Sequence, residues 1–178
     1  MRRLRLRAVW LLVLPFLWLA RPSARLLLVG ASLAVVGLLI RAWAAGTIQK
    51  ERELTTTGPY AFTRNPLYLG SFLLGAGITL AGGHWIWPAL FVLFYATVYG
   101  RTIAGEARLL ADMFGDRFRE YAEHVPAVVP RVTPWRAPWA DGGGFALSRY
   151  RRHREWEALL GALAGFALLA AKLLWGGS

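Results

Sequence analysis

Long apolar stretches without charge alternate along this chain with shorter polar stretches. The longest one runs from residue 65 to residue 100 and contains no Lys, Arg, Asp or Glu. It is too long for one helix across a bilayer, which needs about 20 residues, and long enough for two. The sequence Gly82-Gly83-His84 divides it. The pattern therefore predicts a helical hairpin through a membrane.

Over the whole chain, the pattern predicts an all-α integral membrane protein of about five transmembrane helices, with short cytoplasmic helices between the fourth and the fifth. We expect one membrane domain over residues 1–178. The predicted spans are residues 8–20, 24–46, 66–81, 85–103 and 156–175, and the segment of residues 104–155 is predicted to be cytoplasmic. Within that segment, Gly115 should end one helix and Asp116 should cap the next.

The first apolar stretch has two interpretations. Four arginines precede it within residues 1–7 and small residues follow it, as in a signal peptide. The alternative is a first transmembrane helix that Pro15 shortens or kinks. We favour the helix, and we expect Ser23 to cap the helix that follows.

Charge gives the predicted orientation. The chain has 21 Lys and Arg against 10 Asp and Glu, for a formal net charge of +11. The basic residues flank the apolar stretches, as the positive-inside rule requires, so we expect no nucleic-acid partner. A cytoplasmic N-terminus and an outside C-terminus place seventeen of the 21 basic residues inside. We expect a prokaryotic inner membrane.

Three basic regions receive their own predictions. Residues 131–154 are basic, aromatic and rich in glycine, and should lie on anionic lipid headgroups, with nucleic-acid binding as the rival interpretation. Arg41 and Lys172 stand near the ends of predicted spans, where their side chains should snorkel to the interface. A functional Arg41 inside the membrane is the alternative.

The sequence excludes several kinds of site. It contains no cysteine, so disulfides, thiol catalysis and cysteine-based metal sites are absent. The three histidines, His84, His124 and His153, are scattered without the spacing of metal ligands. We therefore expect no metal.

Candidate chemistry begins where the long uncharged stretch starts. Arg64 is the last charge before it, Asn65 is a good N-cap, and Pro66 suits the first turn of a helix. Backbone donors and a guanidinium would then converge on an anionic group of a ligand. The alternative is a helix start with one interfacial arginine.

A second candidate lies just past the fourth predicted span. Glu106 is a lone acid there and either pairs with Arg108 or Arg101 or binds a cationic or hydroxyl-rich ligand. The predicted topology places the loops that carry Arg64 and Glu106 on one side of the membrane.

Small residues mark helix contacts in the third predicted span. Gly70 and Gly77 share one helical face, and Gly75 and Thr79 share another. We expect helix packing at Gly75 and Gly77, and close approach of a ligand at Gly70.

Two motifs carry a resemblance to a known family. The first reads Gly58-Pro59-Tyr60, then Arg64-Asn65-Pro66-Leu67-Tyr68-Leu69-Gly70. It resembles the RHPxYxG motif of isoprenylcysteine carboxyl methyltransferases and related phospholipid N-methyltransferases. The second reads Glu106-Ala107-Arg108-Leu109-Leu110-Ala111-Asp112-Met113-Phe114-Gly115, followed by Tyr121 and Pro126. It is similar to that family's EExxLxxxFG motif with its later Tyr and Pro.

The resemblance implies a membrane methyltransferase that holds S-adenosylmethionine between the two motifs and methylates a carboxylate or an amine of a lipid or lipidated small molecule. It implies Arg64 and Glu106 as catalytic residues. The cofactor-binding residues that it implies are Leu54, Tyr60, Arg64, Asn65, Tyr68, Gly70, Glu106, Leu110 and Tyr121. Asn65 replaces the family's usual His, and Ala107 replaces its second acid.

Two other functions compete with this one. Sterol reductases, which use NADPH, resemble the family in the same region. A membrane scaffold without catalysis is the other alternative, in which Arg64 and Glu106 only hold the fold. The sequence leaves the oligomeric state open.

Overall fold

The computed structural model describes residues 13–49, 53–140 and 144–176, and all regular elements in these ranges are helical. Residues 13–19 are helical and precede the first complete helix. The elements that follow are α2 (Ala24–Thr47), the 3₁₀ turn η1 (Gly58–Ala61), α3 (Pro66–Ala81), α4 (Ile86–Phe114), α5 (Asp116–His124), α6 (Leu147–Arg152) and α7 (Trp156–Gly176). The prediction of an all-α membrane protein is confirmed.

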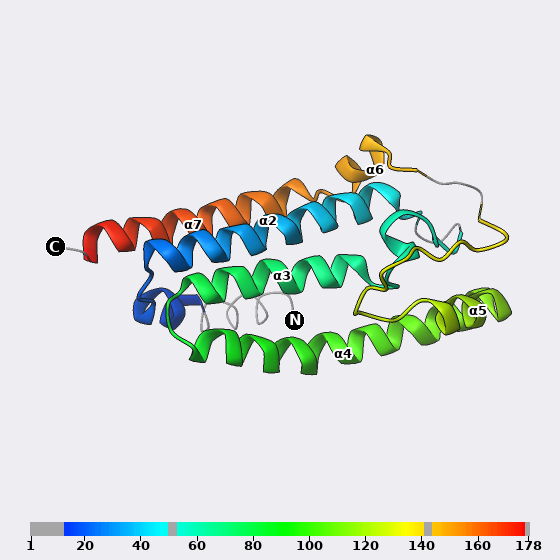
Figure 1. Cartoon of the computed structure of the whole chain (residues 1–178), viewed down its shortest axis with the longest axis horizontal. Helices are drawn as coiled ribbons and strands as arrows, with labels where there is room; N and C mark the ends of the chain where they lie inside the picture. The colour runs from blue at the N-terminus through cyan, green and yellow to red at the C-terminus, as the bar shows by residue number, and fades with distance from the viewer. Residues whose placement is uncertain (1–12, 50–52, 141–143, 177–178) are drawn as a thin grey trace, which may run out of the picture.

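The long helices α2, α3, α4 and α7 run side by side, with α3 between α2 and α4 (Figure 1). The connections on either side of η1 and the short helices α5 and α6 gather at one end of these helices. That end is where α2 and α4 finish and where α3 and α7 begin. Both candidate motifs therefore reach the same end of the molecule.

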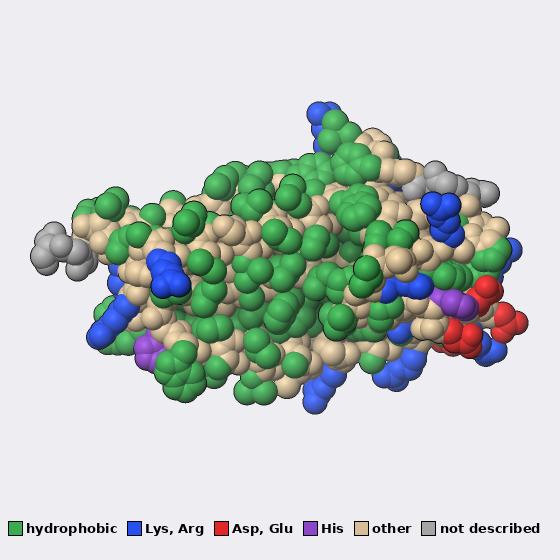
Figure 2. All heavy atoms as spheres, viewed as in Figure 1, with side chains coloured by type: hydrophobic (Ala, Val, Ile, Leu, Met, Phe, Trp, Pro, Cys, Tyr) green, Lys and Arg blue, Asp and Glu red, His purple; other side chains and the backbone are tan. Residues whose placement is uncertain are grey.

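Three helices are long and apolar enough to cross a membrane: α2, α4 and α7 up to Trp175. The 16 residues of α3 are apolar but rise only about 24 Å. Side chains in the middle of the face shown in Figure 2 are largely hydrophobic, and most charged side chains lie toward its two ends and lower edge. The first predicted span lies partly outside the described residues, so the number of five spans stays a prediction, as do the orientation and the single domain.

Helices α2 and α3 touch backbone to backbone. A Cβ atom added at Gly70 would lie 2.6 Å from the Gly37 carbonyl oxygen and 2.6 Å from Cγ of Arg41, both on α2. One at Gly77 would lie 3.0 Å from the nitrogen of Ala34. Gly75 faces the ring of Phe91 on α4 instead. Helix packing at Gly75 and Gly77 is confirmed, whereas the predicted approach of a ligand to Gly70 is wrong, because α2 covers that face.

The basic residues near the ends of the spans bond to the protein. Arg41 forms an ion pair with Glu155, just before α7, at 2.7 Å between Nη2 and Oε2. Lys172 Nζ donates 2.6 Å to the carbonyl oxygen of Leu17. Both charges thus have partners within the protein, and whether either side chain also reaches the membrane interface stays a prediction.

Helix α4 continues beyond residue 103 to Phe114, so the predicted helix end at Gly115 is confirmed, and the start of the cytoplasmic segment at residue 104 stays a prediction. No strong helix breaker precedes Gly115, whose φ of +54° ends the helix. Glu106 consequently stands on a helix rather than in a loop. Asp116 does not cap α5, because Gly115 holds the N-cap position without a side-chain bond. The predicted cap at Ser23 is confirmed by its 3.3 Å bond from the nitrogen of Leu26.

The chain after α5 lies along residues 61–64 through a series of bends rather than as one extended stretch. The nitrogen of Arg64 donates to Pro126 O, and the nitrogen of Arg131 donates to Phe62 O, each at 2.9 Å. Farther on, Arg149 Nε donates 2.8 Å to Gly46 O at the end of α2. Arg131 and Arg149 therefore bond to the protein, and the contact of residues 131–154 with lipid headgroups stays a prediction.

Replacing Gly37 by Ala tests the contact between α2 and α3. The new Cβ would lie 2.5 Å from Gly70 O and 2.8 Å from the nitrogen of Leu74, and both are backbone atoms. We expect Gly37→Ala to lower the free energy of unfolding in detergent by about 1–3 kcal/mol. Gly100→Ala is the matched control, because nothing lies within 4 Å of that position, and it should be neutral or stabilising by up to about 1 kcal/mol. Equal stability of the two variants would contradict the close packing.

Candidate functional site

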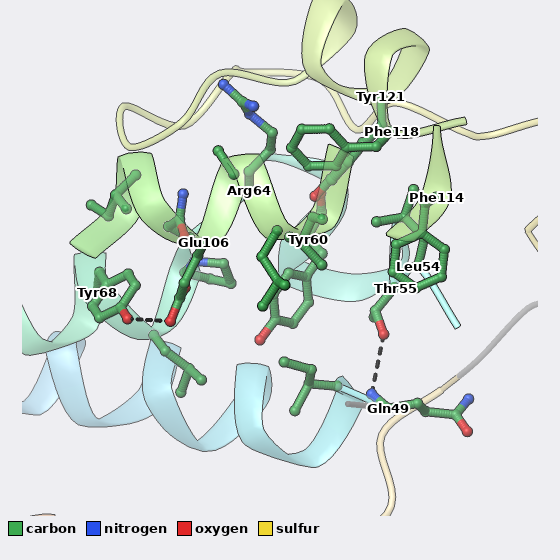
Figure 3. A pocket seen from close by; sticks show the side chains of 18 of the residues that line it. Gln49, Leu54, Thr55, Tyr60, Arg64, Tyr68, Glu106, Phe114, Phe118 and Tyr121 are labelled. Atoms are coloured by element: carbon green, nitrogen blue, oxygen red, sulfur yellow. Dashed lines mark hydrogen bonds between the residues drawn. The ribbon is translucent and has the colours of Figure 1, made fainter. Parts of the chain in front are cut away.

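A cavity of about 560 Å³ lies where the end of α2, the start of α3, the second half of α4 and α5 meet (Figure 3). Its lining includes eight of the nine predicted cofactor-binding residues: Leu54, Tyr60, Arg64, Asn65, Tyr68, Glu106, Leu110 and Tyr121. The ninth, Gly70, faces α2. The prediction that the Arg64 and Glu106 regions meet at one cavity is confirmed.

Glu106 is held by a hydrogen bond from a tyrosine on the neighbouring helix, and both residues line the cavity. Tyr68 Oη donates to Glu106 Oε1 at 2.7 Å, which joins α3 to α4 (Figure 3). The ring of Tyr68 meets that of Tyr99 edge-on, with centroids 5.4 Å apart, and Tyr99 stacks on Tyr95 at 4.2 Å. Among the residues that the structure describes, no ion pair joins Glu106 to an arginine, so the predicted pairing with Arg108 or Arg101 is wrong.

Tyr60 places a buried hydroxyl in the cavity lining. The residue is 6% exposed, and its Oη has no hydrogen-bond partner in the described structure. Its carbonyl oxygen accepts a 2.7 Å bond from Tyr121 Oη. Burial raises the pKa of both phenols, so both are neutral donors at physiological pH. A buried donor without a protein partner beside a cavity is available to a ligand.

The side chain of Arg64 lies over an aromatic ring at the cavity. Its guanidinium carbon lies 5.7 Å from the centroid of the Phe118 ring, and its buried Nε has no partner in the described structure. Figure 3 shows the guanidinium pointing away from Glu106. Asn65 Nδ2 donates 2.9 Å to Ala127 O instead of capping α3. The predicted N-cap bond is therefore absent, although Pro66 does begin the helix.

The aromatic and apolar wall comes from α4 and α5. Phe118 and Tyr121 of α5 are buried against Leu110 and Phe114 of α4, and Leu54 packs against the same cluster. Trp135 stacks on Tyr121 with centroids 5.8 Å apart. This cluster fixes the position of α5, which closes one side of the cavity.

A profile of the family described as phospholipid methyltransferase matches residues 25–117, more than half of the chain. The chain belongs to the phospholipid methyltransferase family. The matched region contains α2, α3 and α4, and thus Arg64, Tyr68 and Glu106. Tyr121 and Glu155 lie beyond it.

Three individual relatives are similar to this chain. The nickel-cobalt-cadmium resistance protein NccN of Alcaligenes xylosoxydans xylosoxydans is 36% identical over 119 residues, which cover 62% of this chain and 51% of that protein. The cobalt-zinc-cadmium resistance protein CzcN of Cupriavidus metallidurans is 36% identical over 112 residues, covering 62% and 50%. The protein-S-isoprenylcysteine O-methyltransferase of Schizosaccharomyces pombe is 32% identical over 78 residues, covering 44% and 33%.

The chain thus spans about half the length of the first two relatives and a third of the yeast enzyme. No solved structure matches it. The predicted resemblance to isoprenylcysteine and phospholipid methyltransferases is confirmed by the family profile and by the yeast relative.

Sequence reasoning did not assign several residues that line this cavity, and it gave a functional Arg41 only as an alternative. The unassigned residues are Gln49, Thr55, Ser71, Tyr99 and Phe118. Arg41 gave the clearest signal, because it is the one charged residue between positions 26 and 49. An arginine inside an apolar span marks a functional position more often than not. Among the described residues, no group of three or more His, Asp or Glu is placed to hold a metal ion.

Two tyrosine variants test the hydrogen bonds of the site. Tyr60→Phe removes a hydroxyl that has no partner, so the free energy of unfolding without ligand should stay equal or rise by about 1 kcal/mol. Tyr121→Phe leaves the carbonyl of Tyr60 unpaired and should lower it by about 1–3 kcal/mol. Unfolding in detergent measures both. A large loss for Tyr60→Phe would show that its hydroxyl bonds to the protein.

Proposed function

We propose that this chain is an integral-membrane methyltransferase that uses S-adenosylmethionine to methylate a lipid or a lipidated small molecule. One observation carries the proposal: in a member of the phospholipid methyltransferase family, the start of α3 and the second half of α4 line a single cavity. A volume of about 560 Å³ lies within the range of sites for small molecules and cofactors.

The lining fits the proposed cofactor. Glu106 offers its second carboxylate oxygen to a hydroxyl or to positive charge, and Tyr60 offers an unpaired neutral donor. Leu54, Leu110 and Phe114 supply apolar surface for a base. When bound, S-adenosylmethionine supplies a methyl carbon that leaves its sulfur as an oxygen or nitrogen of the acceptor bonds to it.

The residues contribute alignment and exclusion of water more than acid–base chemistry. A carboxylate acceptor needs no base. An amine acceptor must lose a proton, and Glu106 is the carboxylate that we assign to take it. Tyr68 holds the Glu106 side chain toward the cavity, so Tyr68 acts as a positioning residue. Arg64 lies outside this pair, over Phe118, and we assign it to binding rather than to proton transfer.

The two departures from the family motifs agree with this assignment. Asn65 lines the cavity but uses its side-chain nitrogen to hold the chain at Ala127. Ala107 packs against the apolar cluster around Phe118, where a second carboxylate would be poorly solvated. Glu106 therefore carries the acidic function of its motif alone.

An apolar edge of the cavity suits a lipid-borne acceptor. Leu109 and Met113 line the cavity and are 59% and 48% exposed on α4. The names of two relatives refer to metal resistance, and we carry no metal function over to this chain from those names.

Titration of the purified chain with S-adenosylhomocysteine tests the proposed function. We expect saturable binding that weakens about 10- to 100-fold in Glu106→Gln, the usual effect of losing a hydrogen bond to a charged group. Asp112→Asn is the matched control, because it removes a carboxylate from the same helix outside the cavity, and its affinity should equal that of the parent.

Absence of binding at millimolar ligand would contradict the proposal. Preference for NADPH over S-adenosylhomocysteine would favour the reductase. A scaffold would bind neither, and its Arg64→Ala and Glu106→Gln variants would lose thermal stability instead of ligand affinity.

A further inference from the structure

Arg41 is fixed inside the helical bundle by two partners. Its Nε donates to Glu155 Oε2 at 2.9 Å and its Nη2 donates to Glu155 Oε1 at 3.0 Å, a two-pronged contact. Its Nη1 donates to Ser71 Oγ. The side chains of Arg41 and Glu155 are only 21% and 10% exposed. The guanidinium therefore has one position, set from α3 and from the start of α7.

This arginine lines the same cavity as Glu106, at a different depth. Ser71 follows Tyr68 by three residues on α3, so the contact of Arg41 lies about 4.5 Å farther along that helix than the contact of Glu106. Tyr99 and Ile103 of α4 also line the cavity and precede Glu106 on that helix. The cavity thus has a carboxylate toward the open end of the bundle and a guanidinium deeper between the helices.

The partners of Arg41 leave part of its binding capacity unused. A guanidinium carries five N–H groups, and the contacts with Glu155 and Ser71 occupy three. Within the described part of the chain, one N–H on each terminal nitrogen has no partner. A buried ion pair is weak evidence for a purely stabilising role, because apolar residues of equal size often stabilise a core as well. A charged pair beside a cavity in a membrane protein indicates a ligand site.

We propose that Arg41 binds the anionic group of an amphiphilic ligand, a carboxylate or a phosphate, whose carbon chain lies along Tyr99 and Ile103. Glu155 is the positioning residue. It holds the guanidinium flat and competes with the ligand for its charge. Glu155 lies outside the region that matches the family, so this anion site depends on the C-terminal part of the chain. The identification of the amphiphile as the methyl acceptor rests on the proposed function. The binding of an anionic amphiphile at Arg41 does not depend on it.

Calorimetric titration of the purified full chain, in a non-ionic detergent and without cofactor, tests the proposal. The probes are hexyl phosphate and hexanoate below micelle-forming concentrations, with hexanol and hexyltrimethylammonium for comparison. We expect the anions alone to saturate the protein, and the tighter one identifies phosphate or carboxylate as the favoured group. Arg41→Gln should weaken that binding at least tenfold. Arg101→Gln, which removes an exposed arginine outside the cavity, should leave it unchanged.

Glu155→Gln separates a ligand site from a structural ion pair. The amide still bonds to Arg41 but no longer competes for its charge, so anion affinity should rise severalfold. A purely structural pair predicts loss of thermal stability with no gain in affinity, and that result would overturn the proposal. Arg41→Lys keeps the charge if Arg41→Gln does not fold, and it should retain anion binding with reduced affinity.

The cofactor titration distinguishes the two proposals. Arg41→Gln should keep its affinity for S-adenosylhomocysteine, and a loss of both affinities would place Arg41 at the cofactor end and contradict its role as an anion site. If the unsubstituted protein binds hexyl phosphate or hexanoate but does not bind S-adenosylhomocysteine, methyl transfer is refuted and the anion site is supported. Failure of both anions to bind the parent would refute the anion site alone.

Discussion

The close contact between the backbones of α2 and α3 determines the rest of this structure. Glycines meet across the interface at two levels, Gly37 with Gly70 and Gly30 with Gly77. Only residues without a side chain allow this approach, and in lipid such packing takes the place of a hydrophobic driving force. The contact sets the register of the two helices, which brings Arg41 level with Ser71.

The position of α4 depends on fewer and more polar contacts. Tyr68 bonds to Glu106, and the stacked Tyr95 and Tyr99 fill the space between α3 and α4. The end of α4 is held by the cluster around Phe118, which α5 brings back over the cavity. One wall of the cavity is thus packed backbone to backbone, and the other is held by side chains. The position of α4 therefore depends on side-chain contacts that are separate from the backbone contact between α2 and α3.

Much of this was predictable because membrane helices follow simple rules. Uncharged stretches of sufficient length predicted the long helices, and Gly82-Gly83 predicted the turn between α3 and α4. The motif pair predicted that the regions of Arg64 and Glu106 share a site. Gly115 correctly predicted the end of α4. The helix runs through Gly105 before it because a single glycine in a helix costs only about 1 kcal/mol.

Side-chain partners were not predictable from spacing. Arg41 and Glu155 are 114 positions apart, and nothing in either local sequence indicates the other. Gly70 was assigned to a ligand because it lies in a motif, whereas its helical face belongs to α2. Asn65 has the residue type of an N-cap, but a carbonyl at Ala127, which comes from tertiary structure, takes its side-chain nitrogen. Local sequence limits the partners that each side chain can have, and the packing of segments distant in sequence determines which partner it bonds to.

The central claim is that α3 and α4 enclose one cofactor-sized ligand between them. Photolabelling with an azidoadenosyl analogue of S-adenosylhomocysteine, followed by peptide mass spectrometry, tests it most directly. The account predicts adducts on residues 53–64 and on residues 106–121, because both line the cavity, and it predicts that excess unlabelled ligand suppresses them. Adducts confined to other parts of the chain, or labelling that excess ligand does not reduce, would contradict it.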